Sequence, residues 1–183
     1  HVEPNVPENA NYQFMPVNNL LKSSFELNYT PAQYYRIVKG RKVYEEPLFP
    51  TFSLRYERAF PMSSEKYVTS YHRLEFGARQ AVDFGMFNRF SWNVNAGLFR
   101  NAKQLQFPDL KHFASTRMPL TERSFDTGFF LIDNYRYATA DRWAQAHMSW
   151  HMAYLLVKQL PFLRKKSFDE ALHLHTLVTY KNS

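Results

Sequence analysis

The stretch from residue 142 to residue 154 constrains the fold more than any other part of the chain, because its polar and apolar residues alternate. Successive side chains of a β-strand point to opposite faces, so this pattern predicts a strand with one apolar and one polar face. On a helical wheel, at about 100° per residue, the same large residues scatter, which makes a helix the weaker alternative. The apolar positions are Ala144, Ala146, Met148, Trp150, Met152 and Tyr154, and the polar positions are Gln145, His147, Ser149 and His151.

Similar alternation recurs along the chain and predicts an antiparallel all-β fold of about seven or eight strands joined without helices. The alternating segments are close to the roughly 9–11 residues of a tilted transmembrane strand and longer than the roughly 5–6 of a typical soluble strand. The clearest segments lie at 24–30, 51–60, 66–82, 86–99, 142–154 and 168–180, with less regular candidates at 34–38 and 126–138.

The domain organisation is predicted to be simple. Residues 1–20 form an irregular lead-in with Pro4, Pro7 and Pro16, and residues 21–183 form a single, incomplete β-barrel region. The chain begins at His1, without Met or a signal-peptide pattern, which is typical of a processed chain or of a piece of a longer one. Successive antiparallel strands run in opposite directions, so alternate connections lie at the same end of the sheet. The connections at 39–49, 83–86 and 137–141 are predicted to share one end, and those at 61–65, 100–125 and 155–167 the other. The second end has two of the longest connections and is therefore predicted to be the outer one.

Composition bears on the environment of these strands. No run approaches the ~18 consecutive apolar residues of a transmembrane helix, which excludes a helical membrane protein. The mean hydropathy of −0.50 is compatible with a membrane barrel, because only alternate residues of its strands need to be apolar. Aromatic residues make up 17% of the chain, more than a small enclosed core would hold. We therefore predict a transmembrane β-barrel whose apolar faces contact lipid.

This orientation divides the strand residues into two predicted groups. The residues expected to face the lumen are Arg73, Glu75, Arg79, Arg89, Asn93, Asn95, His147 and His151. The residues expected to face lipid are Phe90, Trp92, Val94, Leu98, Met148, Trp150, Met152 and Tyr154. The opposite orientation, with apolar faces inward, gives the alternative of a soluble β-sandwich.

The formal charge of +7 and the sequence pI near 9.6 raise the question of an anionic partner. The basic residues are dispersed, and their one tight cluster is Arg164-Lys165-Lys166, so we expect no nucleic-acid partner. The chain has no cysteine, which excludes disulfides and thiolate metal ligands. Arg55, Glu57, Arg73, Glu75, Arg79 and Arg89 fall on polar positions and are predicted to form a charge ladder inside the barrel.

Four histidines are the strongest chemical candidates. His147, His151, His173 and His175 occupy polar positions of adjacent predicted strands, where imidazoles could hold zinc, copper or nickel. Polar lumen residues are the more common role at such positions, so we predict no bound metal, no cofactor and no catalytic residue. A hydrolase formed by Ser149, His151 and Asp169 is a weaker alternative, because no motif marks a nucleophile.

Several motifs resemble the C-terminal barrel region of the domain of unknown function 5686 family. They are the aromatic run 129–143, Ser149-Trp150-His151-Met152, the segment 159–166, Asp109-Leu110-Lys111-His112-Phe113 and Phe49-Pro50-Thr51-Phe52. The resemblance covers roughly residues 45–180 and carries no catalytic signature. Arg136 departs from it, since the family tends to have an acidic residue there, and the chain stops near Lys181, where family members continue through more strands.

This resemblance implies an outer-membrane protein of Bacteroidota, similar to barrels of the BamA and TamA type, in a family whose members often carry a carboxypeptidase-regulatory-like N-terminal domain. We accordingly expect a non-enzymatic barrel in the outer membrane of a Gram-negative bacterium, serving protein assembly or export or acting as a subunit of a larger complex. Its expected partners are outer-membrane lipid and other outer-membrane or periplasmic proteins. The alternatives are a barrel enzyme acting on lipid or lipopolysaccharide, and a soluble β-sandwich binding module.

Overall fold

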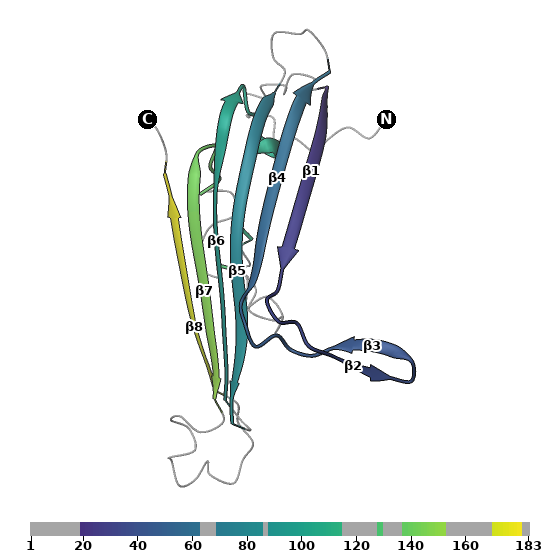
Figure 1. Ribbon diagram of the computed structural model, residues 1–183. Coiled ribbons are helices and arrows are strands. Elements are labelled where there is room, and N and C mark those ends of the chain that lie inside the picture. Colours follow the sequence, from purple (N-terminus) through teal and green to yellow (C-terminus); the bar gives the residue numbers. More distant parts are fainter. Residues whose placement is uncertain are drawn as a thin grey trace, which may run out of the picture.

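The computed structural model describes residues 19–62, 69–85, 88–114, 128–129, 137–152 and 170–180, and its regular structure is almost entirely β (Figure 1). In the part of the chain so described, no helix is long and apolar enough to cross a membrane. The strands are β1 (Leu20–Tyr29), β2 (Tyr35–Val38), β3 (Arg41–Tyr44), β4 (Thr51–Pro61), β5 (Ser70–Phe84), β6 (Asn88–Lys103), β7 (Arg142–Met152) and β8 (Glu170–Thr179), with one 3₁₀ turn, η1 (Phe107–Asp109).

Six of these strands form one antiparallel sheet in the order β1-β4-β5-β6-β7-β8. The predicted antiparallel all-β class is confirmed. The sheet is open, with β1 at one edge and β8 at the other in the described segments, so a closed barrel is not what the structure contains (Figure 1). Neighbouring strands pair along most of their shared length, and the backbone pairing from β4 to β7 is nearly continuous.

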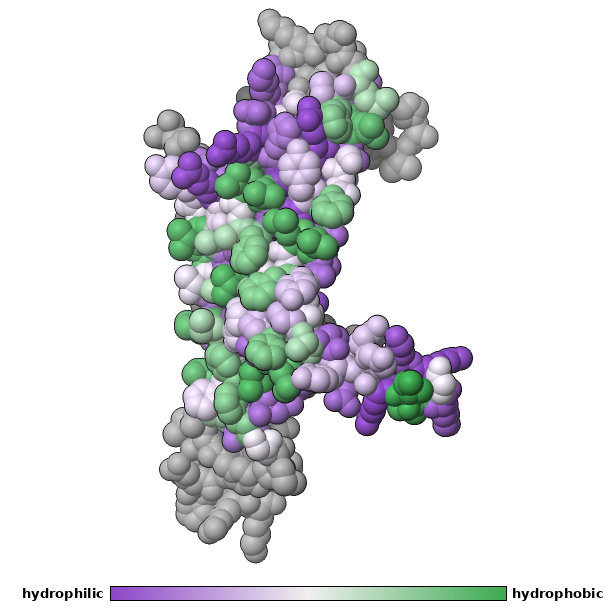
Figure 2. Space-filling view, in the orientation of Figure 1, coloured by the Kyte–Doolittle hydropathy of each residue, from purple (hydrophilic) through white to green (hydrophobic). Residues whose placement is uncertain are grey.

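In-register pairing turns the alternation of each strand into two chemically different faces. Leu54, Phe76 and Ala96 are directly aligned across β4, β5 and β6, and so are their neighbours Arg55, Glu75 and Gly97. One face, the apolar face, is therefore lined by aliphatic and aromatic side chains, and the other, the polar face, by charged and amide side chains. Figure 2 shows hydrophobic residues along the middle of the sheet and hydrophilic residues gathered towards its upper end.

The small core lies on the polar face, at one end of the sheet. Tyr71, Phe99 and Trp143 are buried there around Ala59, with ring centroids 5.4–5.5 Å apart. Leu105 and Phe113, from the segment after β6, pack against them. This cover segment, residues 104–114, is tied to the sheet by a hydrogen bond from Thr69 to the Gln104 carbonyl. Part of the stretch predicted as the loop 100–125 therefore lies across the sheet.

A two-stranded hairpin replaces part of the connection predicted at 39–49. β2 and β3 pair from Tyr35–Tyr44 to Val38–Arg41, which leaves a two-residue turn at Lys39-Gly40. Both turn residues have positive φ, 49° and 74°, as a type I′ turn requires. In Figure 1 the hairpin projects sideways from the sheet beyond the edge strand β1. The predicted strand at 34–38 is confirmed, but it belongs to this hairpin and does not continue β1.

We predicted at which end of the sheet each connection between strands lies, and this prediction was wrong for the connections after β6. It assumed a strand at 126–138, whereas β6 pairs directly with β7 from Asn88–Met152 to Leu98–Arg142. The connection between β7 and β8 therefore begins and ends at the same end as the β5–β6 turn, since Met152 is opposite Glu170. The predicted lead-in up to residue 18 and the basic cluster at 164–166 lie outside the described residues.

Candidate functional site on the polar face

Carboxylates and arginines on the polar face are joined into a network near the buried core. Glu57 accepts hydrogen bonds from the Tyr71 hydroxyl at 2.6 Å and from Arg73 at 2.8 Å. Arg73 Nε also lies 3.1 Å from Glu75, an ion pair without hydrogen-bond geometry, and Lys111 of the cover segment donates to Glu75 at 3.0 Å. These groups are largely shielded from water, so their mutual pairing offsets part of the cost of burying their charges.

Further ion pairs extend the network to both sides. At the β1 edge, Arg55 donates to Glu26. At the lower end of β6, Arg89 pairs with Glu46 and, at 3.4 Å, with Asp83. Of the residues predicted to form the charge ladder, Arg55, Glu57, Arg73, Glu75 and Arg89 take part in ion pairs on this face, and Glu26 and Glu46 are partners that we did not predict.

The four candidate histidines come together on β7 and β8. Pairing places His147 opposite His175, and their Nδ1 atoms are 2.8 Å apart. The rings of His173 and His175 are stacked with centroids 6.2 Å apart, and His151 lies 5.5 Å from His173. Within the described segments, no three His, Asp or Glu side chains are arranged to hold a metal ion. The cluster is held together by hydrogen bonding and ring packing.

His147 is the most enclosed member of this cluster. It is 1% exposed, and the Phe129 ring packs against it at 4.7 Å. Its Nε2 atom is buried and has no hydrogen-bond partner among the residues described. Because two N–H groups cannot bond to each other, the contact with His175 requires one ring to donate and the other to accept.

Ser149 has a different partner from the one considered for a hydrolase. Its hydroxyl lies 2.8 Å from His173 Nδ1, directly across the β7–β8 pair, whereas His151 is two residues away on its own strand. Asp169, the third member of the predicted triad, lies outside the described residues. Ser149 is only 1% exposed, so its hydroxyl is shielded from any substrate in this arrangement.

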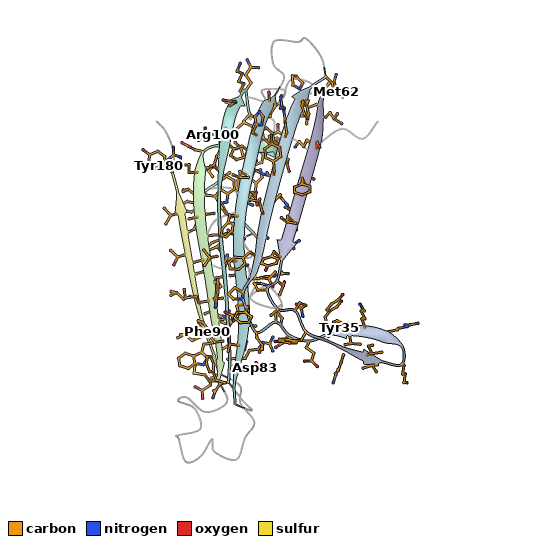
Figure 3. The ribbon with its side chains drawn as sticks, in the orientation of Figure 1. Tyr35, Met62, Asp83, Phe90, Arg100 and Tyr180 are labelled. Carbon is orange, nitrogen blue, oxygen red and sulfur yellow. The ribbon has the colours of Figure 1, made fainter. Side chains whose placement is uncertain are left out.

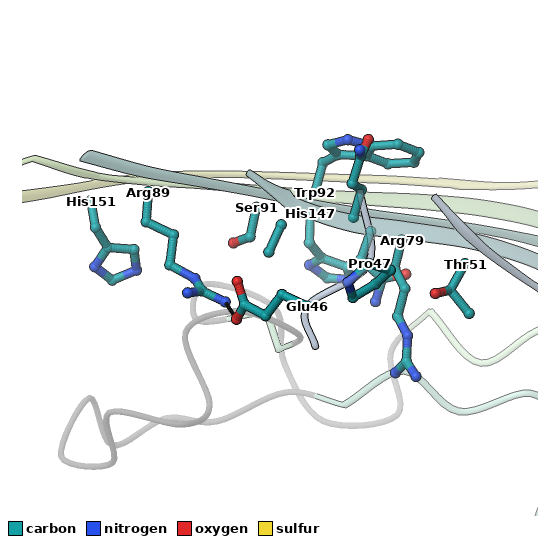
Figure 4. A pocket seen from close by; sticks show the side chains of 12 residues that line it. Glu46, Pro47, Thr51, Arg79, Arg89, Ser91, Trp92, His147 and His151 are labelled. Carbon is teal, nitrogen blue, oxygen red and sulfur yellow. Dashed lines mark hydrogen bonds and ion pairs between the residues drawn. The ribbon is translucent and has the colours of Figure 1, made fainter. Parts of the chain in front are cut away.

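A pocket of about 410 Å³ opens on the polar face near the lower ends of β5, β6 and β7 (Figure 4). Arg79, Arg89 and His151 point into it from the sheet, while Glu46 and Pro47 close it from the segment before β4. Trp92 belongs to the same stretch of β6, but its indole lies on the opposite side of the sheet (Figure 4). The pocket is lined by both signs of charge, with Glu46 paired to Arg89.

The model of the C-terminal domain of the family of unknown function DUF5686 matches residues 1–183. The chain belongs to this family. The match is wider than the segment 45–180 on which we based the resemblance. No curated protein and no solved structure matches the chain.

Within this DUF5686 C-terminal domain, the two predicted groups of strand residues fall on opposite faces. All the residues predicted to face a lumen lie on the polar face. Those predicted to face lipid lie on the apolar face, where Met152 is buried and Phe90, Trp92 and Leu98 are partly buried. Tyr154 lies outside the described residues.

The buried aromatic residues that we missed have one signal in common. Tyr71, Phe99 and Trp143 are apolar residues at polar positions of their strands. A break in alternation on one face indicates that another segment packs there, which is the role of the cover segment in the DUF5686 domain. Glu46 carried no such signal, because its contact with Arg89 depends on the path of the chain after the hairpin.

Proposed function

We propose that this DUF5686 domain forms a section of the wall of a transmembrane β-barrel in the outer membrane, with its apolar face towards lipid and its polar face towards the lumen. The observation that carries the proposal is the exposure of the apolar face. Phe76, near the centre of the sheet, is 51% exposed, and Leu172 on β8 is 60% exposed. A soluble protein rarely leaves so large a continuous apolar surface uncovered.

The height of this apolar surface fits a membrane. On β5 it runs from Leu74 to Phe84, about ten residues, or roughly 34 Å along the strand at ~3.4 Å per residue. A strand tilted by about 40° would cover roughly 26 Å of membrane thickness, close to the ~25 Å apolar band of outer-membrane barrels. On the opposite face, most charged side chains pair with one another, as we expect in a barrel lumen.

The role that we propose is non-enzymatic: protein assembly or export in the envelope, or service as a subunit of a larger outer-membrane complex. It rests on the resemblance to barrels of the BamA and TamA type and on the two unpaired edges, β1 and β8, of the described sheet. Exposed strand edges pair readily with further strands, either of a longer chain or of a partner. Outer-membrane lipid and other envelope proteins are therefore the expected partners.

A barrel enzyme acting on lipid or lipopolysaccharide is the second candidate. The Ser149–His173 hydrogen bond favours it, because a hydroxyl beside an imidazole is the first requirement of an activated serine. Burial of Ser149 is against it. Turnover of a lipid ester that is lost in Ser149→Ala would establish the enzyme, and labelling by a serine-reactive probe would be lost in the same variant.

The proposal is tested by extracting the protein from membranes and measuring its gel mobility with and without boiling, together with circular dichroism in detergent. A folded membrane barrel migrates faster unboiled and gives a β-type spectrum. A protein that stays soluble and monomeric without detergent and shows no mobility shift would contradict the proposal and favour the soluble β-sandwich.

A further inference from the structure

Four basic residues form a row across the apolar face at its upper end. Arg58 on β4 is directly opposite His72 on β5, which is directly opposite Arg100 on β6. Arg142 on β7 continues the row one step lower, opposite Leu98. We call these four residues the basic row. Figure 3 shows Arg100 near the upper end of β6 and Phe90, also on the apolar face, near its lower end.

Among the described residues, the arginines of the basic row have no carboxylate partner, and neither does Arg79 of the polar face, whereas the other three strand arginines of the polar face do. On the polar face, Arg55, Arg73 and Arg89 each pair with a carboxylate. No described carboxylate pairs with Arg58, Arg100 or Arg142, and the one acidic strand residue of the apolar face, Glu170, starts β8 at the lower end. Alternation places Arg58, Arg100 and Arg142 at apolar positions of their strands, and the register brings these positions into one row.

The neighbours of the row hold it in place without neutralising it. The guanidinium of Arg58 lies over the Phe60 ring, 4.4 Å from its centroid. The Tyr56 hydroxyl is 2.7 Å from His72 Nδ1. Beside Arg100, β6 contains an irregularity, because the three steps from Arg100 to Lys103 oppose the two steps from His72 to Ser70, and Asn101 has a φ of 51°. Such bulges redirect the side chains next to them.

Like charges that lie close together on one face of a sheet are unfavourable unless an anion neutralises them. Arginine binds phosphate through paired N–H donors, and Arg100 and Arg142 on adjacent strands, with Arg58 two strands from Arg100, present such donors along one row. The basic row also borders the apolar surface. Each member lies two residues beyond an apolar-face residue of its own strand, Tyr56, Leu74, Leu98 or Ala144. In a membrane this is the level of the lipid headgroups.

The geometry points to a binding site for the phosphate of anionic lipid headgroups along the basic row. The inference rests on the proposed transmembrane orientation and adds a lipid preference to one end of the barrel wall. Lipid supplies both parts that the surface lacks, acyl chains for the apolar face and phosphate for the arginines. The site would select anionic over zwitterionic lipids at this end only.

The test measures unfolding by urea of the full chain folded into phosphatidylcholine vesicles and into vesicles with 30% phosphatidylglycerol. Anionic lipid that binds the folded state shifts the unfolding equilibrium towards it. We expect about a fivefold change in the folded-to-unfolded ratio for each arginine in contact with lipid phosphate. The triple variant Arg58→Gln, Arg100→Gln, Arg142→Gln should lose most of the shift while it still folds in phosphatidylcholine.

The matched control removes three charges from the hairpin instead, through Arg36→Gln, Arg41→Gln and Lys42→Gln. It has the same net charge as the triple variant, and all three residues are exposed. It should keep the full shift. An equal loss in both variants would mean a general effect of net charge and would overturn the site. If the triple variant fails to fold, the single variant Arg100→Gln is compared with Arg36→Gln in the same way.

The outcomes separate this inference from the proposed function. A wild-type protein that folds into phosphatidylcholine but gains nothing from phosphatidylglycerol would refute the lipid site and leave the barrel intact. A protein that inserts into neither vesicle would refute the barrel, and the lipid site with it.

Discussion

His147 and His175 face each other across β7 and β8 with their Nδ1 atoms 2.8 Å apart. Opposed strand residues meet in this way only when both strands keep one register, since a shift by one residue would move one ring to the apolar face. The contact therefore reports on correct pairing of β8, the edge strand. It lies beneath Phe129, in the least exposed part of the cluster.

The first prediction concerns the energetic coupling of these two histidines. A double-mutant cycle of His147→Ala and His175→Ala should give a coupling of about 0.5–1.5 kcal/mol, the contribution of a typical hydrogen bond. The measurement is the free energy of unfolding in urea. The pair His147→Ala and His72→Ala is the control, because these residues lie on opposite faces and should be additive. Additive effects for His147 and His175 would show that the contact contributes no stability.

The second prediction compares two tyrosine hydroxyls on neighbouring strands. Tyr71 is fully buried and donates to the Glu57 carboxylate, so Tyr71→Phe should cost about 1.5–3 kcal/mol of stability. Tyr56, next to Glu57 on β4, bonds to His72 on the exposed apolar face, and Tyr56→Phe should cost less than about 1 kcal/mol. Thermal or urea unfolding of both variants measures the difference. Equal costs would mean that the Glu57 network is not shielded from water.

The sequence was informative about the strands because alternation is a local signal that backbone geometry enforces. The strands at 51–60 and 142–154 were predicted within a few residues of β4 and β7. The first strand of the hairpin was predicted, but the second strand was missed because Arg41 and Lys42 break the apolar pattern, while the turn residue Gly40 was the available cue. Both strands of the hairpin are exposed, so burial imposes no alternation on them.

The site was less predictable, because its contacts join residues far apart in the sequence. The histidines could be grouped, since β7 and β8 are adjacent in the chain and each carries them two or four residues apart. The partners of Arg73 and Arg89 required the register and the path of the loops. Lys111 reaches Glu75 only because the cover segment folds over the polar face. The break in alternation at Tyr71, Phe99 and Trp143 indicates that some segment packs there, but no local pattern shows which one.

The third prediction concerns Gly97, which pairs with Trp143 on β7. A methyl group at Gly97 would overlap the Trp143 indole, a rigid ring in the buried core. Gly97→Ala should therefore destabilise the fold by about 1–3 kcal/mol, as overpacked cores do. It should also change the near-ultraviolet dichroism of the tryptophan.

Gly77→Ala is the matched control for Gly97→Ala. A methyl group there would meet Asn95 Oδ1 and Ser53 Oγ at 2.5 Å, and both atoms end side chains that can rotate away. The cost should be clearly smaller, because two polar groups need only change rotamer. A larger cost at Gly77 than at Gly97 would contradict the packing of Trp143 against the sheet.

The last prediction tests whether the apolar face of the sheet contacts lipid or water. Phe76 is 51% exposed on the apolar face, and Tyr44 is 65% exposed on the hairpin. In water, arginine at either exposed position should change stability by no more than about 0.5 kcal/mol. In a membrane, Phe76→Arg would place a charge inside the apolar band, two residues from its upper edge, at a cost between the ~0–1 kcal/mol expected near the edge and the ~2–4 kcal/mol expected at the midplane. Tyr44→Arg, outside the apolar face, should remain close to neutral.

The readout is the fraction folded after dilution from urea into phosphatidylcholine vesicles, measured as the heat-modifiable band. Phe76→Arg should lower this fraction, whereas Tyr44→Arg should leave it unchanged. The same loss in both variants would indicate a general effect of added charge. No loss in Phe76→Arg would mean that the apolar face at Phe76 does not meet hydrocarbon, because an unpaired cation within the apolar band is costly.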